Sequence, residues 1–160
     1  MNKQEYNDYE RKFNAYLADV GIDAEVFAFE TSCHTVEDAV KTVGADPSEF
    51  VKNICLIGDD GSLIVAIIPG NRRLSRGKVG RALNIAMPEL ATQRQVEEYT
   101  GYLVGGVPPC GYKARFVIDE LVMQNDSVYA SAGSPYSLMK VNPHVIQNVN
   151  DGLVGRISKR

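Results

Sequence analysis

The chain has 160 residues, of which 44% are hydrophobic and 23% are charged, and its formal net charge is −3. These values are typical of one soluble globular domain with a sizeable core, and they exclude a disordered or fibrous protein. Because the net charge is negative, the protein is not of the basic kind that binds nucleic acid mainly through phosphate contacts. Any contact with nucleic acid therefore requires a local basic patch.

The sequence carries no sign of a membrane or secreted location. No apolar run approaches the roughly 20 residues that a membrane-spanning helix needs, and the polar N-terminus lacks the apolar core of a signal peptide. The three cysteines, Cys33, Cys55 and Cys110, are an odd number without framework spacing, which is typical of a reducing compartment. We therefore expect a cytoplasmic protein.

The N-terminal part of the chain predicts a helix, a strand and a second helix. Residues 2–17 carry tyrosine, phenylalanine and leucine at helical spacing, which predicts an amphipathic helix. The sequence AEVFAFE at residues 24–30 predicts a strand. Thr35 resembles the first residue of a capping box, so a helix is expected to follow it to about Val43.

The middle of the chain predicts a hairpin. Residues 50–58 and 62–70 are rich in valine and isoleucine and flank an Asp-Gly turn, which is the pattern of two antiparallel strands joined by a tight turn. Ser75 then predicts the start of a helix over residues 76–84.

The remaining elements point to a mixed architecture. Thr92 and Gln95 form a second capping box, which predicts a helix over residues 93–101. The later expected elements are strands at 114–122, 127–133 and 152–158 and a short helix that begins at Asn142 and Pro143. Because strands and helices are interspersed without strict alternation, we expect an α+β fold with a mixed sheet and one domain over residues 1–160.

Lys52 is a charged residue inside the apolar strand sequence FVKNICLI. Burying a lysine is costly unless its charge is paired or used, so it is a candidate functional residue. The alternative is a lysine at the edge of the sheet whose ammonium group reaches water.

A loop rich in glycine and proline, GGVPPCG at residues 105–111, is the second candidate. Glycine lets a backbone approach a ligand closely, and proline fixes the loop, so the segment is suited to holding a developing oxyanion on backbone N–H groups. The alternative is a rigid turn between strands. The small residues at 131–133 are a weaker, third candidate for a pocket wall.

A dense basic cluster lies on this acidic chain. It consists of Arg72, Arg73, Arg76, Lys78 and Arg81, with no acidic residue among them. The cluster predicts either a contact with the phosphates of a nucleic acid or a solvated helix face.

Four segments resemble one known family. FVKNICLI, IVAIIPGNRRLS, VEEYTGYLVGGVPPCG and YASAGSPYSLMKVNP occur in the order and at about the separations seen in the YbaK/ProX family of aminoacyl-tRNA deacylases, which is related to the editing domain of bacterial prolyl-tRNA synthetases. The resemblance covers about residues 35–145. It implies an α+β domain with a mixed, partly barrel-like sheet flanked by helices, to which residues 1–30 add an N-terminal helix and strand.

The resemblance also implies a function and a set of site residues. It implies hydrolysis of the ester that joins a wrong, small amino acid such as Ala, Cys, Ser or Thr to tRNA, acting in trans, with tRNA as a partner, a synthetase as a further potential partner, and no cofactor or metal. The implied catalytic residues are Lys52, Gly105, Gly106 and Pro109. The implied substrate contacts are Asn53, Val107, Pro108, Cys110, Gly111, Ser131, Ala132 and Gly133. The candidate tRNA contacts are the residues of the basic cluster, which the charge pattern and not the resemblance identifies.

Within this family reading, Lys52 holds a phosphate of the terminal adenosine or the developing charge, and a free ribose hydroxyl helps to orient the attacking water. Asn53, Pro108 and Cys110 stand where the family usually has other residues, which leaves the amino-acid preference open.

Three alternatives remain from the residues themselves. A zinc site would need ligands from among Cys33, His34, Cys55, Cys110 and His144 to converge, without any typical ligand spacing. Cys110 could act as a nucleophile beside a histidine. A non-catalytic module could use the same pocket to bind an aminoacyl or nucleotide group.

Overall fold

The computed structural model describes residues 2–160, which form five α-helices, ten strands and three short 3₁₀ turns. The helices are α1 (Asn7–Val20), α2 (Val36–Val43), α3 (Arg76–Leu83), α4 (Gln93–Thr100) and α5 (Pro143–Asn150). The strands are β1 (Glu25–Ala28), β2 (Val51–Ile57), β3 (Leu63–Pro69), β4 (Arg73–Leu74), β5 (Glu89–Leu90), β6 (Arg115–Asp119), β7 (Val128–Ser131), β8 (Ser137–Val141), β9 (Leu153–Gly155) and β10 (Ser158–Lys159). The 3₁₀ turns are η1 (Lys3–Tyr6), η2 (Pro47–Glu49) and η3 (Val122–Gln124).

The capping residues of four helices were predicted correctly. The side chains of Thr35, Ser75, Thr92 and Asn142 each accept a hydrogen bond from a backbone N–H in the first turn of the helix that follows. Such a bond satisfies one of the donors that a helix start leaves unpaired. At α4 the box is reciprocal, because the side chain of Gln95 also accepts from the N–H of Thr92.

The strands form three sheets, which confirms the α+β class with mixed pairing. The largest has the order β5-β2-β3-β6-β9, in which β3, β6 and β9 run parallel and the β2–β3 hairpin is antiparallel. The second is antiparallel, with the order β1-β8-β7, and the third pairs β10 with β4. The sheets do not close into a barrel over residues 2–160, although a bridge between Phe50 and Tyr129 joins the two larger ones.

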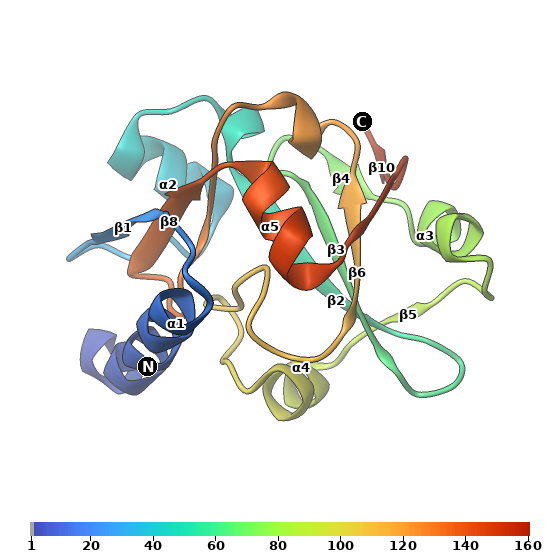
Figure 1. Ribbon diagram of the computed structural model, residues 1–160, viewed down its shortest axis with the longest axis horizontal. Helices are drawn as coiled ribbons and strands as arrows, with labels where there is room; N and C mark the ends of the chain where they lie inside the picture. The colour runs from blue at the N-terminus through green and yellow to red at the C-terminus, as the bar shows by residue number, and fades with distance from the viewer. Residues whose placement is uncertain (1) are drawn as a thin grey trace.

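Both faces of the five-stranded sheet are covered, as Figure 1 shows. Alternate residues of β3, such as Val65 and Ile67, pack with α1 and α5 side chains, while Ile64 and Ile68 pack on the other face against Val79 of α3. The strand is therefore apolar throughout, as expected for a central strand buried on both faces. The helix α2 packs against Phe50 and the β1-β8-β7 sheet in a separate cluster.

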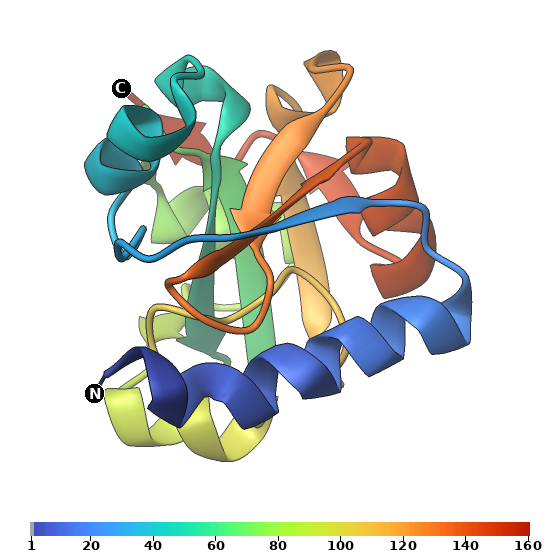
Figure 2. The same cartoon turned by 90° about the vertical axis from the view of Figure 1, so that its left-hand side faces the viewer.

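Helix α1 ties two loops of the molecule together (Figure 2). The hydroxyl of the fully buried Ser134 donates to a carboxylate oxygen of Glu10 at 2.6 Å, and the ammonium of Lys12 donates to the carbonyl of Gly101 at 3.1 Å. Gly133 has φ +100°, and a Cβ there would lie 2.7 Å from the carbonyl oxygen of Tyr9. The N-terminal helix thus positions the loops that begin at Gly101 and at Ala132.

Two features of the C-terminal third differ from the expectation. The predicted single strand at 152–158 was wrong, because Arg156 and Ile157 interrupt it and its halves join different sheets as β9 and β10. The N–H groups of Ile157 and Ser158 donate instead to the buried carboxylate of Asp119. The strand β8 was not predicted, since its pairing with β1 and β7 depends on distant parts of the chain.

No helix within residues 2–160 combines the length and the apolar character that crossing a membrane requires.

Candidate active site

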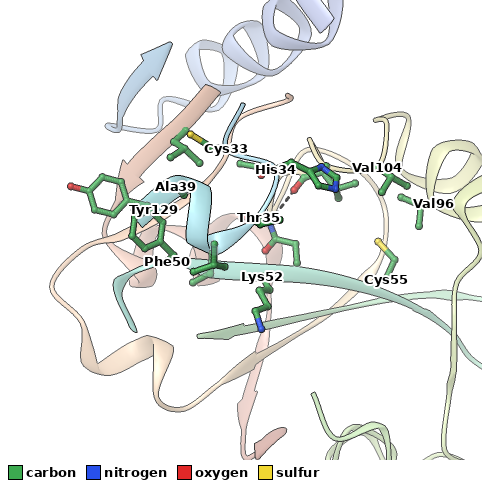
Figure 3. A pocket seen from close by; sticks show the side chains of 17 residues that line it. Cys33, His34, Thr35, Ala39, Phe50, Lys52, Cys55, Val96, Val104 and Tyr129 are labelled. Carbon is green, nitrogen blue, oxygen red and sulfur yellow. Dashed lines mark hydrogen bonds between the residues drawn. The ribbon is translucent and has the colours of Figure 1, made fainter. Parts of the chain in front are cut away.

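A pocket of about 240 Å³ lies where the two larger sheets meet, and we call it the α2–β2 pocket. Its walls come from the segment before α2, the first half of β2, the loop around Gly105, and the strands β7 and β8. Figure 3 shows His34 and Thr35 on one side, Val96 and Val104 on another, and Phe50 with Tyr129 at the far end. The loop GGVPPCG therefore contributes to a cavity, and the alternative of a plain turn does not describe it.

Asn53 lines the pocket and carries an unpaired acceptor that is buried in the pocket wall. Its side-chain amide donates to the carbonyl of Val107 at 3.0 Å, which fixes the orientation of the amide group. The other end of the group, Oδ1, is buried and has no hydrogen-bond partner among residues 2–160. A buried acceptor without a donor costs about 1–3 kcal/mol. A ligand donor would gain this hydrogen bond once a small shift of the pocket wall exposes the oxygen.

Cys55 lies on the same face of β2 as Asn53, two residues further along the strand. Burial raises the pKa of its thiol to about 12. The thiol is therefore protonated at neutral pH and is a poor nucleophile. Cys55 acts as a small apolar wall of the pocket.

Gly105 is one of two residues of the loop, with Val107, that line the pocket. Its φ is +94°, a conformation that disfavours every residue with a side chain. A Cβ at this position would collide with the imidazole of His34, whose Cε1 would lie 2.8 Å away. The N–H of Gly105 has no protein acceptor among the described residues, so it is free to donate to a ligand.

The role predicted for Gly106 needs correction. Its N–H donates to the carbonyl of Leu103 at 3.0 Å within a turn, so this group is not available as an oxyanion donor. A Cβ at Gly106 would lie 2.6 Å from the Cα of Ser134 and 2.7 Å from the carbonyl oxygen of Gly133. Gly106 is thus a packing glycine that lets two loops approach each other.

The rest of the loop lies behind the pocket, which the sequence did not predict. Pro108 and Pro109 are buried, and their carbonyl groups accept hydrogen bonds from Tyr112 at 2.6 Å and from Asn150 at 3.0 Å. A Cβ at Gly111 would lie 3.4 Å from the ring of Tyr16. Of the implied contacts in this loop, the structure brings Gly105 and Val107 to the pocket and uses Pro108, Pro109, Cys110 and Gly111 to anchor the loop.

Cys110 is 1% exposed and does not line the pocket. Burial raises the pKa of its thiol to about 12, and the hydroxyl of Tyr16 beside it lowers that pKa only in small part. A protonated thiol outside the cavity does not support the nucleophile alternative.

We therefore expect Cys110→Ser to keep deacylase activity within about threefold of the parent. A buried hydroxyl without a full set of partners should cost about 1–3 kcal/mol of folding stability. Thermal unfolding and a deacylation assay on the same preparation measure the two effects. If the variant folds but has no activity, and thiol alkylation also inactivates the parent, the results would support Cys110 as the nucleophile.

The small residues at 131–133 divide between two roles. Ser131 lines the pocket. Ala132 is buried and its N–H donates to the carbonyl of Ser137 at 3.0 Å, while Gly133 meets the backbone of α1. The close approach predicted for Gly133 is real, but its partner is helix α1.

Lys52 lies at the rim of the pocket. Its half-buried side chain leaves β2 on the side away from Cys55 (Figure 3), and its ammonium donates to the carbonyl of Arg72 at 2.8 Å. Burial lowers the pKa of this ammonium group. The same side chain borders a neighbouring hollow that it shares with His34, Glu37 and Gly70. Lys52 therefore borders both the pocket and the neighbouring hollow.

The basic cluster splits into bound and free side chains. Arg72 and Lys78 donate to the hydroxyl and the carbonyl of Ser158, at 2.7 and 3.0 Å. Arg76 forms an ion pair with Glu89 at 3.0 Å. Arg73 and Arg81 are exposed and have no ion-pair partner in the described part of the chain.

Several pocket residues escaped the sequence analysis. His34, which the sequence suggested only as a zinc ligand, lines the pocket together with Thr35, Val96, Tyr129 and Leu138. Only the motif of Thr35 as a helix cap was visible in the sequence, and it gave no sign of a cavity. Residues 2–160 contain no group of three or more His, Cys, Asp or Glu side chains that could hold a metal ion.

Comparisons with known proteins agree on one family. The model of the aminoacyl-tRNA editing domain matches residues 30–149. EbsC of Enterococcus faecalis, by name a candidate Cys-tRNA(Pro)/Cys-tRNA(Cys) deacylase, is 26% identical over 136 residues, which cover 84% of this chain and 83% of that protein. A proline–tRNA ligase of Maridesulfovibrio salexigens is 33% identical over 95 residues, which are 58% of this chain and 16% of the ligase.

A solved structure supports the same assignment. It is the crystal structure of a candidate trans-editing enzyme for prolyl-tRNA synthetase, with a TM-score of 0.87 and 26% identity, and the match covers 95% of this chain and 98% of the other. The chain therefore belongs to the aminoacyl-tRNA editing domain family, within its YbaK-like group of deacylases.

Proposed function

We propose that the protein acts in trans on mischarged tRNA and removes a small amino acid, which it binds in the α2–β2 pocket. The observation that carries the proposal is that two residues lining one cavity each carry an unpaired backbone or amide group, the acceptor Oδ1 of Asn53 and the donor N–H of Gly105. At about 240 Å³, the cavity is below the roughly 300–1,000 Å³ of pockets for drug-sized ligands. It suits an aminoacyl group better than a whole nucleoside.

The two groups match the polar ends of an aminoacyl ester. The N–H of Gly105 donates to the ester carbonyl oxygen, where negative charge develops during attack by water, and such preorganised donors stabilise a transition state strongly. Asn53 Oδ1 accepts from the α-ammonium group, the donor that alanine, cysteine, serine and threonine share. The buried thiol of Cys55 lies on the same wall and limits the size of the side chain.

Lys52 extends this arrangement toward the tRNA. Its ammonium lies at the rim, away from the acceptor and donor that hold the aminoacyl group, and the neighbouring hollow opens beside it. This placement favours a contact with a phosphate near the terminal adenosine over a contact with the developing oxyanion. A lysine is a common phosphate ligand as a point charge.

The test is a deacylation assay with purified protein and a panel of tRNAs that carry alanine, cysteine, serine, threonine or proline. The proposal expects release of at least one small amino acid by the protein alone, without a synthetase. N-acetylation of that aminoacyl group should slow release, because it removes the α-ammonium group whose hydrogen bond Asn53 Oδ1 accepts. Tight binding of the whole panel without release would instead support a non-catalytic binding module.

The basic cluster gives a separate prediction about tRNA docking. Figure 1 shows α2 and α3 on opposite sides of β2 and β3, so the cluster leads from the rim at Arg72 toward the far side of the sheet. We expect the double change of Arg73 and Arg81 to alanine to weaken tRNA binding and to lower the slope of log affinity against log salt by about 2, since about one counterion is released per phosphate contact.

Hydrolysis of a short aminoacyl ester should change much less in this double variant, because that substrate reaches only the pocket. The matched control replaces the exposed Arg11 and Lys113, which removes the same charge elsewhere on the surface. An unchanged salt slope in the Arg73 and Arg81 variant would show that the cluster is only a solvated face.

A further inference from the structure

We propose that Glu10 is a positioning residue for deacylation, because its carboxylate fixes the place where two loops that border the α2–β2 pocket meet. The inference rests on the proposed function and extends it to helix α1, which lies outside the residues 30–149 that the family's model matches. The starting observation is the hydrogen bond of 2.6 Å that the hydroxyl of Ser134 donates to Glu10 Oε1. Glu10 does not itself line the pocket, so it acts through Ser134.

Ser134 belongs to a short loop, residues 132–136, which we call the Ser134 loop. The loop joins β7 to β8, and both strands reach the pocket: Ser131 lines it at the end of β7, and Leu138 lines it near the start of β8. Within this connection, the carbonyl of Ser134 accepts from the N–H of Ser137 at 3.3 Å. A displacement of the Ser134 loop would therefore be passed on to both of these strands.

The Ser134 loop also packs against the glycine- and proline-rich loop. A Cβ at Gly106 would lie 2.6 Å from the Cα of Ser134, so the two backbones touch at this point. The neighbours of Gly106 in the chain, Gly105 and Val107, line the pocket. Because close-packed backbone leaves little free space, neither loop can shift far without the other. The place of Ser134 thus sets the relative position of two pocket walls.

The buried hydroxyl of Ser134 depends on Glu10. Ser134 is fully buried, and the carboxylate of Glu10 is the one hydrogen-bond acceptor of its hydroxyl within residues 2–160. The same hydroxyl accepts from the N–H of Tyr136 at 3.0 Å, so it also shapes the turn of the loop. Hydrogen bonds to a charged acceptor are the stronger kind, and a buried donor that loses its acceptor is penalised. Without Glu10, the loop would move to find another partner for this hydroxyl.

Helix α1 is a firm base for this contact. Phe13 and Leu17 of the helix are buried in the main hydrophobic core. A second bond runs from the ammonium of Lys12 to the carbonyl of Gly101, but Lys12 is exposed, so water competes for that bond. The bond of Glu10 is shielded at its serine end. Glu10 is therefore the residue through which α1 holds the pocket loops most strongly.

The experiment compares Glu10→Ala, Glu10→Gln and Asp19→Ala in single-turnover deacylation of a mischarged tRNA, at a temperature where circular dichroism shows every variant to be folded. Glutamine keeps an acceptor oxygen for Ser134, and Asp19 is an exposed carboxylate on the same helix. We expect Glu10→Ala to be about 10- to 100-fold slower, since a misplacement of about 1 Å can cost that much. Glu10→Gln should recover most of the rate, and Asp19→Ala should match the parent. Binding of uncharged tRNA should not change.

Two further measurements separate positioning from a general loss of stability. If Glu10 acts through Ser134, adding Glu10→Ala to Ser134→Ala should slow the reaction no further, because the two residues form one interaction. The amide signals of Gly105 and Val107 in a nitrogen-15 NMR spectrum should shift in Glu10→Ala and stay in place in Asp19→Ala. This spectrum needs no substrate, and it applies even if Ser134→Ala does not fold.

Three results would overturn the role of Glu10 and leave the proposed function intact. They are a parental rate in Glu10→Ala, a Glu10→Gln variant as slow as Glu10→Ala, and effects of Glu10→Ala and Ser134→Ala that multiply. Unchanged amide signals of Gly105 and Val107 in Glu10→Ala would also contradict it. If the parent protein releases no amino acid from any mischarged tRNA, the proposed function itself fails, and the role of Glu10 in deacylation fails with it.

Discussion

Replacing Lys52 by alanine is expected to lower kcat/KM for a mischarged tRNA by roughly 30- to 1,000-fold, because a charge-assisted contact to the substrate is worth on the order of 2–4 kcal/mol in the transition state. The fold should remain intact. The side chain lies at the rim of the pocket, and the hydrogen bond that the change removes is one donated to the carbonyl of Arg72. The measurement is the rate of amino-acid release together with the thermal unfolding temperature.

Two companion variants sharpen this comparison. Lys52→Arg keeps the positive charge and should retain more activity than the alanine variant, although its guanidinium has a different shape. Lys113→Ala removes an exposed lysine and should behave like the parent. A folded Lys52→Ala variant with near-normal rates would show that Lys52 makes no important contact with the substrate.

Gly105→Ala is expected to reduce deacylation by at least about 100-fold, the scale seen when one oxyanion donor is lost. The alanine would have to adopt φ +94° or move the backbone, and its Cβ would collide with the imidazole of His34. Either response displaces the unpaired N–H of Gly105, a residue that lines the pocket. The backbone penalty alone should cost about 1–3 kcal/mol of stability.

Gly21→Ala separates the backbone penalty from the effect on the pocket. Gly21 ends α1 with φ +71°, and a Cβ there would meet no atom within 4 Å. Its alanine variant should therefore lose a comparable amount of stability and keep its activity. If Gly105→Ala is as active as Gly21→Ala, the loop does not supply the oxyanion donor.

Local sequence signals predicted the elements that depend on neighbours in the chain. The caps Thr35, Ser75, Thr92 and Asn142 bond to residues two or three positions away, so their motifs were sufficient. The β2–β3 hairpin was predicted for the same reason, since its turn and its apolar flanks are adjacent. The strand β8 was missed because its partners lie far away in the sequence.

The site was predicted in outline through the family resemblance, and its details required the fold. Strand alternation places Asn53 and Cys55 on one face of β2, but nothing in the sequence shows that the carbonyl of Val107 orients the amide of Asn53. His34 meets Gly105 only because α2 packs beside the β1-β8-β7 sheet. The sequence also gave no sign of the turn in which the N–H of Gly106 donates to the carbonyl of Leu103.

The most direct test of the account is the rate of amino-acid release from a small-residue mischarged tRNA with the enzyme in excess, measured beside the rate in buffer alone. The account predicts release far faster than in buffer for the parent protein and for Cys110→Ser, and a strong reduction in Lys52→Ala. It would be contradicted if the parent protein bound the tRNA to saturation while the ester decayed at the rate seen in buffer.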